Sequence, residues 1–212
     1  MSDNDRARIL IVYDSNSGNT YRMAQQIGRG VESVRQCTAL LRAAPKVGER
    51  NSSRLPPVPD SGAPYAEVAE LLECEGLIIG SPTHFGNMSA SLKHFLDRTT
   101  PYWLGGKLSG KPAAAFTSTG SMHGGQEATL LGMMVPLLHH GMLICGLPYT
   151  HPQLMQTRRG GTPYGASHVS GEDGKAPLVD SETVLCRALG ARVASTACLL
   201  AGRASDTLSS SS

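Results

Sequence analysis

The residues best suited to bind a ligand lie in three short segments rich in glycine, hydroxyl and amide side chains. The first, Ser15-Asn16-Ser17-Gly18-Asn19-Thr20, leads into a helical pattern and holds no lysine or arginine. A helix N-terminus offers unpaired backbone N–H groups and a partial positive charge, which favour a phosphate. The segment therefore suits one monophosphate held close to the backbone. It matches neither GxxxxGK[ST] nor GxGxxG, the patterns of triphosphate and dinucleotide loops.

The same segment has a simpler interpretation, because Ser, Asn and Thr begin many helices that bind nothing. The segment alone does not decide between the two. The other two segments, 81–88 and 118–125, each follow an apolar run typical of a buried strand.

A few residues outside these segments also bear on chemistry. Trp103, the only tryptophan, stands in a glycine-rich connection, where an aromatic residue favours binding over simple packing. His139 ends a helical pattern, so it could reach a ligand or only interact with the helix dipole. Arg158-Arg159 is more typical of a solvated loop pair than of a phosphate contact. No carboxylate pair or Ser–His–Asp spacing supports hydrolase chemistry.

Alternating strands and helices must position these residues. Apolar runs typical of strands cover 9–13, 37–42, 76–80, 113–117 and 142–147, and helical spacing recurs between most of them and after a cap at Asp180 or Ser181. This alternation predicts an α/β fold, a doubly wound five-stranded parallel sheet with helices on both faces. Ligands bind such sheets beyond the carboxyl ends of the strands, so the three segments should share one edge. The long segments 45–64 and 149–179 indicate interfaces or pocket walls.

Length and charge narrow the class of protein. The 212 residues fit a polar N-terminal lead over 1–8, a single domain over 9–202 and a disordered polar tail over 203–212. A net charge of +2 is too balanced to indicate a nucleic-acid or membrane partner, and no apolar run approaches the roughly 20 residues that cross a bilayer. The five widely spaced cysteines are typical of reduced, structural thiols in a cytoplasmic protein, with no metal site.

Four stretches beyond the first segment carry a more specific pattern. They are Gly80-Ser81-Pro82-Thr83-His84-Phe85-Gly86-Asn87-Met88, Ser118-Thr119-Gly120-Ser121-Met122-His123-Gly124-Gly125-Gln126-Glu127, His139-His140-Gly141-Met142 and Arg159-Gly160-Gly161-Thr162-Pro163-Tyr164-Gly165-Ala166. Together they resemble the WrbA-type NAD(P)H:quinone oxidoreductases, flavoproteins of the flavodoxin-like fold. The first segment is shared with all flavodoxins, and the resemblance spans residues 9–202.

The resemblance implies FMN as the bound cofactor and assigns its contacts. Ser17 stands where the family often has a tyrosine on the nicotinamide side. His84 replaces a frequent arginine, so a charge contact there depends on pH. His139 would reach the flavin of a neighbouring subunit in a homotetramer, and Trp103 would lie over the substrate. The FMN phosphate would be held by Ser15, Asn16, Gly18, Asn19 and Thr20, the isoalloxazine lined by Thr83, His84 and Phe85, and its pyrimidine edge met by backbone N–H groups of Ser118, Thr119, Gly120, Ser121, Met122 and His123.

The implied activity is a ping-pong cycle in which NADH or NADPH reduces FMN and leaves, and a quinone then takes both electrons to become the quinol. A flavodoxin-type electron carrier is one alternative, but flavodoxins are usually strongly acidic and this chain carries +2. A regulatory flavoprotein is another, although the charge argues against direct DNA contact.

Overall fold

A computed structural model describes residues 6–47, 59 and 62–202 of the chain. The predicted tail over 203–212, most of the lead over 1–8 and much of the segment 45–64 lie outside the described residues, so those predictions stay open.

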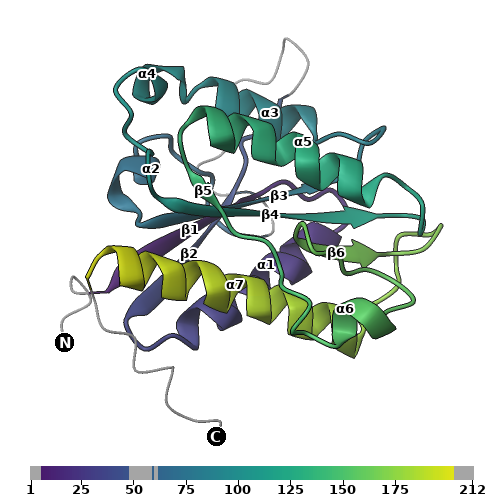
Figure 1. The fold of residues 1–212 in the computed structure, drawn as a ribbon. Helices are drawn as coiled ribbons and strands as arrows, with labels where there is room; N and C mark the ends of the chain where they lie inside the picture. Colours follow the sequence, from purple (N-terminus) through teal and green to yellow (C-terminus); the bar gives the residue numbers. More distant parts are fainter. Residues whose placement is uncertain (1–5, 48–58, 60–61, 203–212) are drawn as a thin grey trace, which may run out of the picture.

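A parallel β-sheet forms the centre of the molecule (Figure 1). Its strands run in the order β2-β1-β3-β4-β5, and the chain passes from one side of β1 to the other between β2 and β3. That reversal is the switch point at which doubly wound sheets bind ligands. The strands are β1 (Ala7–Tyr13), β2 (Cys37–Ala43), β3 (Gly76–Pro82), β4 (Pro112–Thr119), β5 (Leu143–Ile144) and β6 (Ala166–Val169).

Among the described residues the sheet has six strands, one more than the five predicted. Both β5 and β6 pair with β4: β5 lies beside Pro112 and Ala113, and β6 beside Phe116 to Thr119. One edge position is thus shared by two short strands. Between Ile144 and Ala166 the chain forms the helix α6 and no further strand of the sheet. The strand predicted over 142–147 is correspondingly short, and β6 was missed inside the predicted loop.

Helices cover both faces of the sheet, as predicted (Figure 1). Side chains alternate between the faces along each strand: Ile9 and Ile11 of β1 belong to one core cluster, and Leu10 and Val12 to the other. One face carries α1 (Asn19–Glu32), α6 (Gln153–Gln156) and α7 (Asp180–Leu200); the other carries α2 (Glu70–Glu73), α3 (Ala90–Asp97), α4 (Thr100–Trp103) and α5 (Gln126–His139).

Helices α1 and α7 approach closely through two glycines. A Cβ atom on Gly190 would lie 2.1 Å from the carbonyl oxygen of Ile27, and one on Gly30 would lie 2.0 Å from that of Arg187. No side chain could occupy either space without moving a backbone. The contact therefore determines how α1 sits on the sheet.

Helix α7 is long and apolar enough, at 21 residues, to cross a membrane by length and composition alone. The helix carries Arg187 and Arg192, so the expectation that no uninterrupted apolar run approaches this length is not contradicted. Leu185, Leu189 and Val193 of α7 are fully buried in the core cluster shared with α1 and β1. This pattern is typical of a core helix. The helix is preceded by Val179, not capped by Asp180 or Ser181, and the Val179 N–H donates to Glu182.

Candidate active site

A cavity of about 230 Å³ lies at the carboxyl ends of the strands and is lined by all three predicted segments. The register of the strands explains why the three segments lie close together. Tyr13 at the end of β1 stands opposite Gly80, and Pro82 at the end of β3 stands opposite Ser118, so neighbouring strands finish close together. The lining residues are Asn16, Ser17, Asn19, Thr20, Pro82, Thr83, His84, Ser118, Thr119, Gly120 and Ser170.

The first segment wraps the N-terminus of α1 with unused donors. Gly18 takes the left-handed conformation at φ 81°, and the backbone N–H groups of residues 15–18 donate to no other described residue. The N–H groups of Asn19 and Thr20 begin the helix and have no acceptor within it. The Thr20 hydroxyl also makes no hydrogen bond within the described chain, although Thr20 is only 1% exposed. Several donors without partners thus lie in this segment, and its residues Asn16, Ser17, Asn19 and Thr20 line the cavity.

The fold places two positively charged side chains, Lys46 and Arg22, beside the first segment. The Lys46 ammonium, just beyond β2, bonds to the buried Asp14 carboxylate, the Ser15 carbonyl at 3.2 Å and Asn16 Oδ1 at 2.8 Å. Arg22, on the first turn of α1, donates to Asn19 Oδ1. The absence of lysine and arginine from the segment itself therefore does not leave it without nearby positive charge. Arg22 could have been found from its helical spacing to Gly18, whereas no local signal pointed to Lys46.

The second segment forms a tight turn that holds an aromatic ring outward. His84 and Asn87 exchange two backbone hydrogen bonds of 2.9 Å each. Phe85 and Gly86 between them have φ of 51° and 74°. A left-handed phenylalanine costs roughly 1–2 kcal/mol, and the Phe85 side chain is fully exposed. Phe85 is the only non-glycine residue with positive φ in the described ranges. Such strain beside a cavity favours a role in binding.

The third segment presents a row of free backbone donors. Gly124 donates to the Ser121 carbonyl at 3.1 Å and closes the turn. The N–H groups of residues 120–123 have no acceptor within the described part of the chain. Ser121, Met122 and His123 are exposed. This arrangement suits the polar edge of a flat heterocycle.

A fourth wall comes from Ser170, which the sequence analysis missed. Its N–H and its hydroxyl both donate to the Thr119 carbonyl, at 2.8 and 3.0 Å. Ser170 directly follows β6, so the rule that binding residues follow strands would have found it had β6 been predicted. The next turn reaches α1, because Asn19 Nδ2 donates to the Gly174 carbonyl at 2.8 Å.

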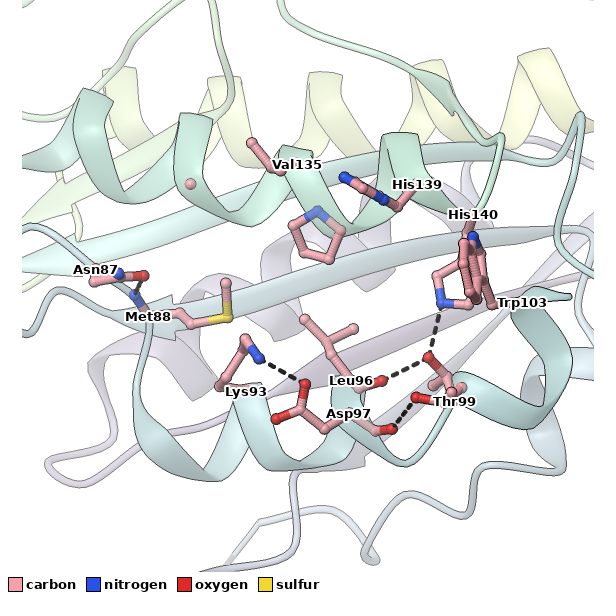
Figure 2. Close-up of a pocket in the computed structure, with 13 residues that line it drawn as sticks. Asn87, Met88, Lys93, Leu96, Asp97, Thr99, Trp103, Val135, His139 and His140 are labelled. Atoms are coloured by element: carbon pink, nitrogen blue, oxygen red, sulfur yellow. Dashed lines mark hydrogen bonds and ion pairs between the residues drawn. The ribbon is translucent and has the colours of Figure 1, made fainter.

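Trp103 and His139 line a different and larger cavity of about 660 Å³ between α3 and α5 (Figure 2). Helix α5 begins after the third segment and ends at His139, about 20 Å away for its 14 residues. The structure therefore does not bring Trp103 or His139 to the first cavity within one chain. Despite its smaller volume, the first cavity is the better candidate site, because the segments that hold the unpaired donors line it.

His140, beside His139, forms a fixed wall of this second cavity. The Thr99 hydroxyl donates to the Leu96 carbonyl at 2.6 Å, so it must accept from His140 Nε2 at 2.7 Å (Figure 2). Burial, and then the neighbouring His139, lower the pKa of His140. The ring is therefore neutral at pH 7 and serves as a hydrogen-bond donor to Thr99.

The chain is similar in sequence to known proteins. A family model described as NADPH-dependent FMN reductase matches residues 7–148. A protein of Trichlorobacter lovleyi (strain ATCC BAA-1151 / DSM 17278 / SZ) named NAD(P)H dehydrogenase (quinone) is 40% identical over 195 residues, covering 89% of this chain and 96% of that protein.

Solved structures show the flavodoxin-like fold. A WrbA-like flavodoxin from Agrobacterium tumefaciens superimposes with a TM-score of 0.62 at 23% identity, covering 91% of this chain and 98% of the other. Oxidised Flavodoxin 1 from Bacillus cereus gives 0.58 at 17% identity, covering 89% and 98%.

Proposed function

The chain belongs to the family described as NADPH-dependent FMN reductase, and from that premise we propose that it is an FMN-dependent NAD(P)H:quinone oxidoreductase. The observation that carries the proposal is the cavity at the switch point. Three loops line it, and they hold backbone N–H groups and the Thr20 hydroxyl that have no hydrogen-bond partner in the described chain. The name of the Trichlorobacter relative supports a quinone as the electron acceptor.

The residues of this cavity fit FMN in chemistry and position. The loop 15–20 would hold the phosphate through its backbone N–H groups and Thr20, with Lys46 and Arg22 adding positive charge nearby. The N–H groups of 120–123 would donate to the pyrimidine edge and stabilise negative charge there. Bound FMN would supply the two-electron chemistry, taking a hydride from NAD(P)H and passing it to the quinone.

The exposed side chains of the second segment would form the open face of the site. Phe85 and His84 project beside the cavity, and Ser17 lines it from the first segment. A flat nicotinamide or quinone could stack in this region in turn, which is what a ping-pong cycle requires. Ser17 would contact the nicotinamide side.

Anaerobic absorbance titration tests the function. FMN, then NADH, then benzoquinone are added to the purified protein. We expect NADH to bleach the flavin band and benzoquinone to restore it, and steady-state kinetics to give parallel double-reciprocal lines. Intersecting lines would contradict the ping-pong order. Bound FMN that NADH leaves oxidised would contradict the dehydrogenase function and favour an electron carrier.

We also infer that the active form is a homo-oligomer, by resemblance a tetramer, in which a neighbouring subunit supplies Trp103 and His139. Support comes from their placement away from the first cavity of their own chain. The outer face of α5 also leaves Leu131, Val135 and Leu138 exposed, an apolar surface typical of an interface.

If sites are built across subunits, FMN affinity should rise with assembly, because each process then favours the other. Flavin fluorescence titrations at increasing protein concentration, with sedimentation run in parallel, measure this coupling. Equal FMN affinity in monomer and oligomer would show that each site is complete in one chain. The buried cysteines, with no disulfide among the described residues, support the inference that the enzyme works in a reducing cytoplasm.

A further inference from the structure

A completely buried ion pair lies behind the cavity wall formed by Ser170. His168 of β6 and Glu182 of α7 are both 0% exposed, and His168 Nδ1 lies 2.8 Å from Glu182 Oε2. The other ring nitrogen, Nε2, lies 3.2 Å from the Ala176 carbonyl oxygen. Both ring nitrogens therefore face an oxygen acceptor.

The acceptors determine the protonation state of the ring. Glu182 Oε1 accepts the N–H groups of Gly160 and Val169 at 3.0 Å each, and Oε2 accepts that of Val179 at 3.0 Å. With these donors around it, Glu182 is a carboxylate. A carbonyl oxygen cannot donate, so both contacts of His168 are satisfied only when both ring nitrogens carry protons.

The Glu182 side chain stays ionised over the ordinary pH range. Burial alone would raise the pKa of Glu182, but the hydrogen bonds from His168, Val179 and Val169 outweigh it, so its pKa lies below the usual value. Its stabilising contribution is thus lost only as the pH falls well into the acid range. Cys186, one turn further along α7, is fully buried, and burial raises the pKa of its thiol. Arg159, in the loop before β6, donates to the carbonyl of Val169 in β6 at 2.8 Å.

His168 closes the neck of the loop that runs from Ser170 to Ala176. The Ala176 N–H donates to the Ser170 carbonyl at 2.9 Å, and the same residue's carbonyl accepts from His168. Within the loop, Glu172, Asp173 and Lys175 are exposed. The loop touches the candidate site twice, through Ser170 in the cavity wall and through the Gly174 carbonyl that holds the Asn19 amide.

We propose that His168 is a positioning residue for the cofactor site: as a doubly protonated ring held by Glu182, it keeps the 170–176 loop closed and so holds Ser170 and Asn19 at the phosphate end. The inference rests on the proposed function, since FMN is the ligand concerned. Only with a hydrogen on Nε2 can the ring donate to the Ala176 carbonyl and so close the neck of the loop.

His168→Gln tests the proposal, because its single amide nitrogen cannot take the places of both ring nitrogens, which face Glu182 and the Ala176 carbonyl. We expect FMN to bind about tenfold more weakly at pH 7, the size of one charge-assisted hydrogen bond, with a smaller change for riboflavin, which lacks the phosphate. His94→Gln, on the exposed surface of α3, should leave both affinities unchanged.

A second measurement needs no variant. In protein labelled with ¹⁵N-histidine, His168 should show two protonated ring nitrogens in the folded protein. A singly protonated ring would overturn the proposal, as would equal FMN affinity in wild type and His168→Gln. If the wild-type protein bound no FMN, the proposed function would fail instead.

Discussion

Replacing Thr20 with valine should weaken FMN binding about 10- to 100-fold while leaving riboflavin binding unchanged. Valine keeps the shape of this almost fully buried side chain and removes only the hydroxyl, which makes no hydrogen bond within the described chain and lines the cavity. A hydrogen bond to a charged group contributes roughly 1.5–3 kcal/mol, which corresponds to that range of affinity. Fluorescence titration with both ligands measures the difference.

Thr129→Val is the matched control. Thr129 is also completely buried, and its hydroxyl has no partner among the described residues, but it lies within α5 and lines neither described cavity. FMN affinity should be unchanged in this variant. Equal losses for FMN and riboflavin in Thr20→Val would show that the hydroxyl does not contact the phosphate and that the loop serves only to cap the helix.

Gly190→Ala should lower the free energy of unfolding by at least about 3 kcal/mol, the upper end of the usual cost of overpacking. The added Cβ would lie 2.1 Å from the Ile27 carbonyl oxygen and 3.0 Å from the Val31 nitrogen. Because these are backbone atoms of α1, no side-chain rotation relieves the clash, and α1 must move. Urea unfolding measures the change, and FMN binding should weaken as well, since α1 carries the phosphate segment.

Gly132→Ala provides the comparison for stability. Gly132 lies inside α5, and a Cβ atom there meets nothing closer than Asn87 Oδ1 at 3.7 Å. Alanine should therefore stabilise this helix by about 0.5–1 kcal/mol. An unchanged unfolding midpoint for Gly190→Ala would mean that the two helices can separate without cost, contrary to the packing described above.

The parts of the fold that follow from the sequence are those encoded by local pattern. The apolar run at β1 and the three- and four-residue spacing in α1 predicted their elements, and the rule that ligands bind beyond the carboxyl ends of strands placed the three loops together. The predicted contacts of individual site residues with FMN stay predictions, which the Thr20 variant begins to test.

The missed features depend on contacts distant in sequence. The strand β6 holds four residues within a glycine-rich segment, and it exists because β4 supplies its hydrogen-bonding partner. Ser170 was missed with it. Lys46 reaches the first segment only because β2 lies beside β1. Likewise, Trp103 of α4 and His139 of α5 come to one cavity only through the packing of these helices, which residue types alone do not reveal.

The pairing of α1 with α7 has a consequence for synthesis on the ribosome. The apolar face of α1, which includes Met23, Ile27 and Val31, is covered by a helix that begins about 150 residues later. At a synthesis rate of roughly 5–20 residues per second, α7 follows α1 after on the order of 10–30 s. During that interval the apolar face of α1 is uncovered on that side, so a nascent chain that stalls before residue 180 becomes a substrate for chaperones.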